Sequence, residues 1–311
     1  MLSLFLLVIT IDPTKLSFGL KSESDSFWDG SVIFYNNTYH LFASRMSYGC
    51  GLDTWQTNSE CIRATSSSPY ENFTVEETVV DSMCHNPSIL KFNDTFYLFY
   101  IGMYEGSPYK NCTNGTTTGL VPDDLHINPC FIRYKTSTDM RKWSSAVFVY
   151  TVFHIPFCPT NPAPIVVNNS IELIYRAYTF SLGSRTFGEY LFRAVKWKDT
   201  NHFWDPWIDK ELEDPSMIFH LDRYWLFINN KFNNDTYVGS YGTSFDLQTW
   251  NFQPLYNLTM IGLEEKRLQR RERPFVLVLN STNGVLYNSI LEYGQKDHVY
   301  IQAFPIKFSV N

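Results

Sequence analysis

The chain has 311 residues, and 44% of them are hydrophobic, which is enough to form a large buried core. The 31 acidic residues outnumber the 25 basic ones, and the basic residues are scattered, so the clustered basic patch that nucleic-acid binding requires is missing. No Gly/Ser-rich, Pro-rich or charge-block segment interrupts the sequence, which argues against a linker or a disordered region and favours one domain.

The first predicted element is a signal peptide over residues 1–18. An apolar run of about nine residues precedes Asp12, which is too short to span a bilayer but suits a signal-peptide core, although a basic n-region is lacking. We expect residues 19–311 to form one domain with no transmembrane segment. Asn-x-Ser/Thr sequons, which indicate a secreted or lumenal glycoprotein, begin at Asn36, Asn72, Asn93, Asn111, Asn114, Asn168, Asn234, Asn257 and Asn280.

The rest of the sequence repeats one pattern: a polar opening, an apolar strand, a polar turn and an aromatic strand. The clearest copy is EDPSMIFHLDRYWLFIN, residues 213–229, and related copies begin at Trp28, His85, Thr160 and Arg271. Spacings of 57, 75, 53 and 58 residues separate the aligned positions Asp29, Asn86, Asn161, Asp214 and Glu272. Near-regular spacing of this kind is typical of an array of like units.

Each copy predicts a β-hairpin, because apolar and aromatic residues flank a turn made of Asn, Asp, Ser or Gly. The spacing leaves room for two more strands, and a second motif of Ser or Thr, then Asp, then Trp follows Ile132 and Val238. Four strands per unit, repeated five times, predict an all-β protein with a single five-bladed β-propeller. The alternating segment 298–308 is expected to complete the last sheet, and N-terminal residues are candidates for closing the ring.

The six cysteines are spaced unlike any zinc-binding pattern, so they predict disulfides and an oxidising compartment. We expect Cys50 to pair with Cys61 and Cys112 with Cys130, each within one blade. Cys84 is then left to pair with Cys158. The Gly-, Thr- and Asn-rich segment 104–130 is expected to be an ordered, glycosylated loop at the rim.

Four sequons, at Asn36, Asn93, Asn168 and Asn280, share one position, the turn between the first two strands of a copy. In a propeller the innermost strand lines the channel, so its start and its following turn lie at opposite mouths. Glycans on these turns would leave the other mouth, where the innermost strands begin, uncovered. We expect that sequon-free mouth to be the functional face.

A radial array brings the strand starts together around one axis, so the acidic residues that open them should converge. Glycoside hydrolysis uses such a group: one carboxylic acid protonates the leaving oxygen, while a second carboxylate activates water or attacks the sugar. The sequence contains no phosphate loop, metal-ligand spacing or other familiar catalytic motif, so we expect no cofactor and no metal.

A resemblance to a known family lies in the openings WDGS, HNPS, EDPS and RERP, in the second strands YHLFAS, FYLFYIG and YWLFIN, and in the motifs TSTDMRKW and TSFDLQTW. In these segments the sequence resembles the five-bladed propeller glycosidases of glycoside hydrolase family 43 and its arabinanase, xylosidase and levansucrase/invertase relatives. The likeness covers nearly the whole mature chain. It implies a general-base Asp in the first blade, which Asp29 matches. It also implies an Asp in the second blade and an acidic Glu in the third, where this chain has Asn86 and Asn161.

We therefore expect a secreted glycoside hydrolase that acts on a poly- or oligosaccharide by inversion, with Asp29 as base, Glu272 as acid and Asp214 orienting or tuning one of them. Substrate-binding residues are expected at the same mouth: Trp28, His85, Asn86, Asn161, Arg176, Glu213, Arg271 and Arg273. Carboxyl separations of about 6–10 Å would indicate inversion, and about 5 Å would indicate retention.

Two alternatives stay open. A lectin-like propeller that binds glycans without cleaving them is favoured by Asn86 and Asn161, which stand where the family carries acids. A structural or protein-binding propeller is the other, because this fold hosts many unrelated functions.

Overall fold

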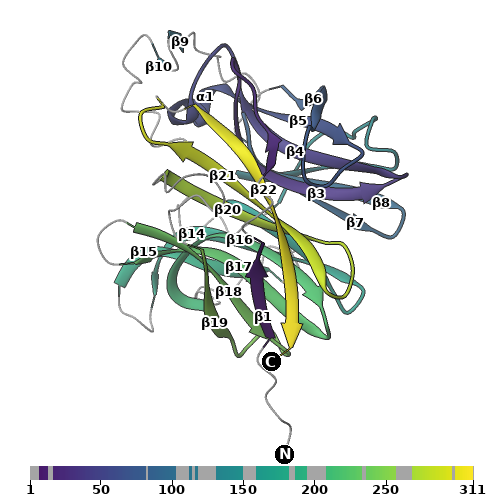
Figure 1. Ribbon diagram of the computed structural model, residues 1–311, viewed down its shortest axis with the longest axis vertical. Helices are drawn as coiled ribbons and strands as arrows, with labels where there is room; N and C mark the ends of the chain where they lie inside the picture. Colours follow the sequence, from purple (N-terminus) through teal and green to yellow (C-terminus); the bar gives the residue numbers. More distant parts are fainter. Residues whose placement is uncertain are drawn as a thin grey trace, which may run out of the picture.

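The computed structural model describes residues 7–12, 17–81, 83–102, 112–113, 116–117, 131–149, 159–181, 186–194, 208–232, 236–256, 268–295 and 298–310. Over these residues the chain is almost entirely β-structure and forms a five-bladed β-propeller, as the repeats predict (Figure 1). The innermost strands form a ring, each packed beside the next and the last beside the first: β3 (Ser26–Tyr35), β7 (Cys84–Phe92), β13 (Thr160–Val167), β16 (Ile208–His220) and β20 (Leu268–Val278).

Blades one and two are separate four-stranded antiparallel sheets. Blade one continues from β3 through β4 (Thr38–Met46), β5 (Ser59–Ser66) and β6 (Thr74–Val80), with η1 (Leu52–Thr54) and α1 (Trp55–Asn58) between β4 and β5. Blade two continues from β7 through β8 (Thr95–Gly102), β11 (Phe131–Ser137) and β12 (Val147–Phe148). The short strands β9 (Cys112–Thr113) and β10 (Thr116–Thr117) pair with each other between β8 and β11.

Blades three and four share one seven-stranded sheet, because the start of β16 pairs with β15 and its end pairs with β17. Blade three contains β13, β14 (Ser170–Ser181) and β15 (Thr186–Ala194). Blade four contains β16, β17 (Arg223–Phe232), β18 (Thr236–Ser244) and β19 (Asn251–Tyr256).

Blade five closes the ring with strands from both ends of the chain. It contains β20, β21 (Asn283–Glu292) and β22 (Val299–Val310), and the N-terminal strands β1 (Leu7–Ile11) and β2 (Ser17–Leu20) pair with β22 (Figure 1). This confirms the N-terminal residues as the closing partner. β1 lies within the segment predicted as a signal peptide, and cleavage of that segment stays a prediction.

An apolar core fills the space between each pair of neighbouring blades, because alternating side chains of a strand reach both faces of its sheet. Each core contains buried residues of two neighbouring blades, such as Phe42 and Leu98, Phe99 and Leu173, Ile174 and Leu226, Trp225 and Phe304, and Leu41 and Val285. The cores hold the blades at fixed angles, so the starts of the innermost strands are held at fixed positions around the channel.

Each innermost strand contains a bulge near its start, where the register with the second strand shifts. One residue of each bulge has a left-handed backbone: Asp29 (φ 61°), Asn86 (53°), Asn161 (54°), Asp214 (57°) and Arg273 (59°). Asp and Asn tolerate this conformation best among residues with a side chain, whereas Arg rarely adopts it.

The bulges correct the alignment of the fifth copy. A Gly or Pro follows each left-handed residue, at Gly30, Pro87, Pro162, Pro215 and Pro274. The equivalent of Asp29 in blade five is therefore Arg273 and not Glu272. Glu272 instead occupies the preceding position, which it shares with Glu213 in blade four.

The turns after the innermost strands lie at the opposite end of those strands, as the sequence predicts. Left-handed residues at Asn36, Asn93 and Asn168 form the tight turns of blades one to three, as is typical of two-residue hairpins. These asparagines and Asn280 of blade five are exposed. In blade four the corresponding turn, Leu221–Asp222, has no sequon.

The expected disulfide pairing is wrong for the four cysteines that the structure describes. Cys50 pairs with Cys112, and Cys61 pairs with Cys84. Both bonds join blade one to the chain of blade two, because β5 of blade one packs against β7 and brings Cys61 beside Cys84. The expectation failed because it favoured cysteines close in sequence, whereas a propeller brings together strands of adjacent blades. Cys130 and Cys158 lie outside the described residues.

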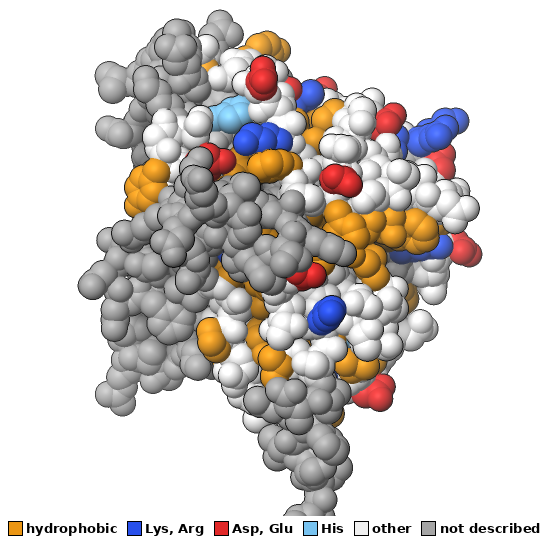
Figure 2. Space-filling model, viewed as in Figure 1, with side chains coloured by type: hydrophobic (Ala, Val, Ile, Leu, Met, Phe, Trp, Pro, Cys, Tyr) orange, Lys and Arg blue, Asp and Glu red, His pale blue; other side chains and the backbone are white. Residues whose placement is uncertain are grey.

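Acidic and basic side chains are interspersed on the described part of the face shown in Figure 2, which does not gather one sign of charge. Among the residues that the structure describes, no helix has the length and apolar character needed to cross a membrane.

Candidate active site

The five left-handed residues, which we call the hub, meet at the centre of the ring. Asn86 donates to Asp29 from its backbone N (2.9 Å) and its Nδ2 (2.6 Å), and Asn161 Nδ2 donates to Asp214 Oδ1 (2.7 Å). Arg273 joins the two pairs: its Nε lies 3.0 Å from Asp29 Oδ1, and its Nη1 forms an ion pair with Asp214. The hub thus ties all five blades together, and its side chains line a cavity of about 50 Å³.

The two hub aspartates are buried and well supplied with donors. Asp29 also accepts from Ser44 Oγ (3.2 Å), and Asp214 also accepts from Asn229 Nδ2 (2.7 Å). Burial raises the pKa of Asp214 to about 6, although Arg273 opposes this shift. Burial acts to lower the pKa of Arg273, but Asp214 and Asp29 outweigh it and raise that pKa. The charges therefore stabilise one another.

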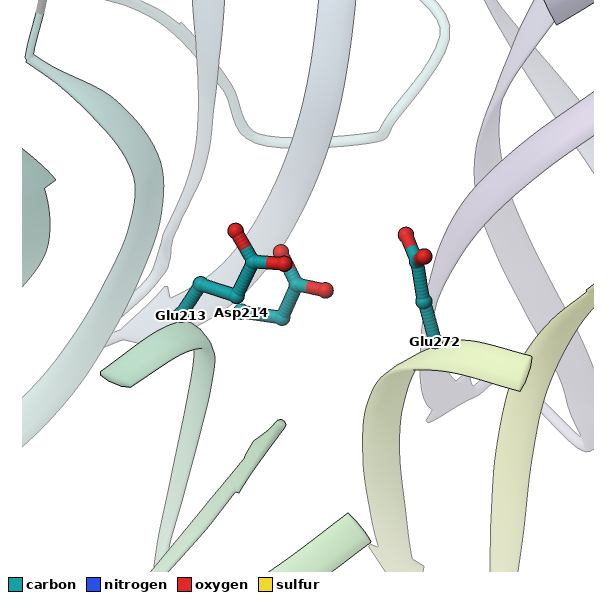
Figure 3. Close-up of side chains that lie close together, drawn as sticks. All are labelled: Glu213, Asp214 and Glu272. Carbon is teal, nitrogen blue, oxygen red and sulfur yellow. The ribbon is translucent and has the colours of Figure 1, made fainter. Parts of the chain in front are cut away.

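Two glutamates stand one residue before the hub, on neighbouring blades. Glu213 opens the bulge of β16 and Glu272 that of β20, and Figure 3 shows the carboxyl groups of Glu213 and Asp214 pointing towards that of Glu272. One oxygen from each of these three carboxylates lies within 4.8 Å of the others. The Glu213 side chain is 16% exposed and that of Glu272 is 4% exposed, so the pair extends from the buried hub towards solvent.

Each of the two glutamates forms an ion pair with a different arginine. Arg176 of β14 places Nη1 2.8 Å from Glu213 Oε2, and Arg270 of β20 places Nε 2.9 Å from Glu272 Oε1. Burial raises the pKa of Glu272, Arg270 lowers it and Glu213 raises it further, and the net shift is upward. A carboxyl group with a raised pKa beside a second carboxylate is the arrangement that lets one acid hold a proton while the other stays ionised.

Glu213, Asp214 and Glu272 are also the one group, among the described residues, whose three potential ligand atoms are close enough to share a metal ion. Each of these carboxylates already faces a guanidinium group, from Arg176, Arg273 and Arg270 respectively. These arginines supply the positive charge that the acids need.

Two of the expected substrate-binding residues are core residues instead. Trp28 is 1% exposed and packs with Met46 and Leu291, because its position in the bulge turns the indole into the gap between blades. Arg271 is fully buried, with its guanidinium over the rings of Tyr256 and Phe304. Arg271 lies one residue before Glu272 on β20, so its side chain points to the opposite side of the strand.

His85 lies beneath a side chain that sequence reasoning missed. Its ring packs against Trp55 of α1, with centroids 4.8 Å apart and the ring planes tilted by 30°, and its Nε2 lies 3.8 Å from Asp29 Oδ2. Burial lowers the pKa of His85 to about 4 despite the nearby Asp29, so the ring is neutral near pH 7. Trp55 belongs to no repeated motif, and only its place in the β4–β5 connection brings it to the mouth.

Below the hub the channel becomes apolar. A second cavity of about 280 Å³ is lined by side chains such as Ile89, Ile165, Met217 and Phe275 towards the sequon-bearing turns. Polar and charged groups that suit a hydroxyl-rich ligand therefore lie at the sequon-free mouth.

Comparisons with known proteins connect this fold to glycoside hydrolases. No family model matches the sequence, and no curated protein matches it either. Among solved structures, one described as a glycoside hydrolase is similar with a TM-score of 0.67 and 12% identity, covering 94% of this chain and 91% of the other.

Two further structures are similar in the same way. A family 117 glycoside hydrolase produced by the marine bacterium Zobellia galactanivorans has a TM-score of 0.60 and 15% identity, covering 98% of this chain and 91% of the other. An exo-1,5-alpha-L-arabinanase from a bovine ruminal metagenomic library has a TM-score of 0.60 and 11% identity, covering 94% and 99%. At these identities the likeness shows a fold shared with propeller glycosidases.

Proposed function

We propose that the protein is a secreted glycoside hydrolase whose catalytic pair is Glu213 and Glu272. The observation that carries this proposal is the convergence of their carboxyl groups, with Asp214, within 4.8 Å at the mouth of the channel. The resemblance of the fold to propeller glycosidases supports it. Asp29, expected from the sequence to be the base, is assigned here to the hub, because its carboxylate is buried and bound by Asn86, Ser44 and Arg273.

We infer retention of configuration rather than the inversion expected from the sequence, because one oxygen of Glu213 lies within 4.8 Å of one oxygen of Glu272. Retaining glycosidases hold their carboxyl groups about 5–5.5 Å apart, whereas inverting ones leave about 6.5–9.5 Å for a water. In the first step the ionised Glu213 forms a bond to the anomeric carbon while Glu272 gives its proton to the departing glycosidic oxygen. In the second step Glu272 takes a proton from a water that attacks the same carbon, and Glu213 leaves as a carboxylate.

The assignment of roles follows from the surroundings of each residue. Glu272 is the more buried of the two, and burial raises its pKa, which favours the protonated form that a general acid needs. Glu213 is nearer to solvent and faces Arg176, which stabilises its ionised form. Arg176, His85 with Trp55, and Asn86 are the candidates for contacting the sugar.

A glycan-binding propeller without hydrolysis is the second candidate, because amides replace acids at Asn86 and Asn161. The two candidate functions are distinguished by incubating the protein with arabino-, xylo-, fructo-, galacto- and manno-oligosaccharides while measuring binding and the formation of new reducing ends. New reducing ends from the wild-type protein support the hydrolase. Saturable binding with no product from any sugar contradicts it and favours the lectin-like function.

The proton on Glu272 gives a prediction about pH. Because the acid must be protonated, kcat/KM should fall as the pH rises through the pKa of Glu272, which lies above the ordinary glutamate range. Arg270 lowers that pKa, so the Arg270→Met variant should move this alkaline limb to higher pH. Arg193→Met, which removes the arginine paired with Glu172 in blade three, is the matched control and should leave the limb in place. If the alkaline limb of kcat/KM lies at the same pH in Arg270→Met as in the wild type, the role of Glu272 as general acid is contradicted.

We also propose that the chain is N-glycosylated on the face opposite the active site. Asn36, Asn93, Asn168 and Asn280 are exposed turn residues on that face, and the disulfides Cys50–Cys112 and Cys61–Cys84 suit an oxidising compartment. Expression through a eukaryotic secretory pathway should give a protein whose mass falls on treatment with peptide N-glycosidase, with these four asparagines converted to aspartate. Unmodified asparagine at all four in the secreted protein would contradict this arrangement.

A further inference from the structure

A buried chain of hydrogen bonds connects the hub to the strand that carries Glu272. Asn288 Nδ2 donates to the Tyr256 hydroxyl (2.9 Å), Tyr256 donates to Asn229 Oδ1 (2.8 Å), and Asn229 Nδ2 donates to Asp214 Oδ2 (2.7 Å). At its other end Asn288 Nδ2 lies 3.3 Å from the backbone carbonyl of Glu272. The three bonds from Asn288 to Asp214 have their donors pointing the same way, towards the Asp214 carboxylate, so they strengthen one another, whereas the bond from Asn288 Nδ2 to the Glu272 carbonyl points the other way.

This series of hydrogen bonds from Asn288 through Tyr256 and Asn229 to Asp214, which we call the relay, crosses from one blade to the next at the point where the two glutamates face each other. Asp214, Asn229 and Tyr256 belong to β16, β17 and β19 of blade four, and Asn288 belongs to β21 of blade five. Glu213 precedes Asp214 on β16, and Glu272 lies on β20. The relay therefore joins the two strands whose separation decides the distance between the glutamates.

Tyr256 is the rigid middle of this relay. Its ring fits against β18 where residue 239 is glycine, and a Cβ at Gly239 would lie 2.0 Å from the ring. The Arg271 guanidinium covers the ring, 4.2 Å from its centroid, and Arg271 Nε lies 3.4 Å from Asn288 Oδ1. Asn229 is fully buried, Asn288 is 1% exposed and Tyr256 is 5% exposed, so no member of the relay is open to solvent.

We propose that Tyr256, acting through Asn229 and Asn288, is a positioning residue that holds the Glu213 and Glu272 carboxyl groups at their catalytic separation. The Tyr256 hydroxyl bonds to Asn229 and Asn288, and its effect comes from tying blade four to blade five. This inference rests on the proposed function for its catalytic consequence. The distance that it sets can be measured whether or not the protein hydrolyses sugars.

The test compares Tyr256→Phe with Tyr241→Phe. Both variants are made in the full 311-residue chain, where both changes remove one hydroxyl from the same apolar core between blades four and five, but the Tyr241 hydroxyl bonds to the backbone of Ile9, away from the relay. Crystal structures of both variants should show the Glu213–Glu272 carboxyl distance lengthened in Tyr256→Phe and unchanged in Tyr241→Phe. With an oligosaccharide that the wild type hydrolyses, kcat should fall about 10- to 100-fold in Tyr256→Phe, while KM changes by less than about threefold.

Asn288→Ala breaks the relay at the next member and should reproduce both effects. An unchanged carboxyl distance in Tyr256→Phe, or an equal effect in Tyr241→Phe, would overturn the proposal. So would the failure of both relay variants to fold while Tyr241→Phe folds, because the relay would then act on stability alone. A wild-type protein without hydrolytic activity would defeat the proposed function, but the distance measurement would still decide the positioning role.

Discussion

Replacing Glu272 with Gln is expected to lower kcat/KM by roughly 10²- to 10⁴-fold, the usual contribution of a general acid. Gln keeps the size of the side chain and its contact with Arg270, but it has no acidic proton for the leaving oxygen. The loss should be smaller on an aryl glycoside with a good leaving group, because such a bond breaks with little protonation. Glu213→Gln should be at least as damaging on both kinds of substrate, since no covalent intermediate can then form.

The matched control is Glu172→Gln in blade three. Glu172 is a buried glutamate that accepts from Arg193 Nε (2.6 Å), so its replacement also removes a buried glutamate–arginine pair, but away from the mouth. It should leave kcat/KM within about twofold of the wild type if the catalytic geometry is undisturbed. Full activity of Glu272→Gln on every hydrolysed glycan would remove Glu272 from the mechanism.

The second large effect concerns the hub. Arg273→Met should lower the free energy of unfolding by about 3–5 kcal/mol, because removing one partner of a buried ion pair leaves uncompensated charge in the interior. Here two carboxylates, Asp29 and Asp214, lose the same counter-ion. Chemical denaturation near pH 7, followed by tryptophan fluorescence, measures this difference.

Two comparisons separate the charge effect from lost packing. Lys21→Met removes an exposed partner 3.8 Å from Glu292 and should change the free energy of unfolding by less than about 1 kcal/mol. Adding Asp29→Asn and Asp214→Asn to Arg273→Met removes the unpaired charges and should recover part of the loss. A change below about 1 kcal/mol in Arg273→Met would mean that the hub charges do not stabilise the ring.

The blade architecture was predictable because every blade has the same structural requirements. Every innermost strand needs a bulge at the mouth and a tight turn at the other end, so polar openings and Asn-rich turns recur at similar spacing. The sequons at Asn36, Asn93, Asn168 and Asn280 followed from this regularity. Two-residue turns with left-handed backbone favour the asparagines that sequons require.

The sequence names the same acidic residues from which the site is proposed here, but it places the fifth copy in a different register. Glu272 was aligned with Asp29 because both are acidic, whereas the backbone aligns Arg273 with Asp29 through the Pro or Gly that follows. The positions of Pro215 and Pro274 could have shown this, since the bulge requires the same break in the ladder in each blade. With the corrected register, Glu213 and Glu272 occupy equivalent positions.

The specific side-chain contacts between blades could not be predicted from the sequence. The Cys61–Cys84 bond, the Trp55–His85 ring contact and the Tyr256 relay each join segments of different strands or blades whose side chains meet only after the sheets pack. Nothing in the residue types at these positions names their partners. Trp28 failed for the same reason, because an aromatic residue beside an acid can face a ligand or a neighbouring sheet equally well.

The most direct test of the central claim is the anomeric configuration of the first product, followed by time-resolved proton NMR during hydrolysis of a substrate found with the oligosaccharide panel. Glu213 and Glu272, with one carboxylate oxygen of each within 4.8 Å of the other, predict a product that first appears with the configuration of the substrate and then mutarotates. A product that first appears with the opposite configuration would contradict the assignment of these two glutamates as a retaining pair.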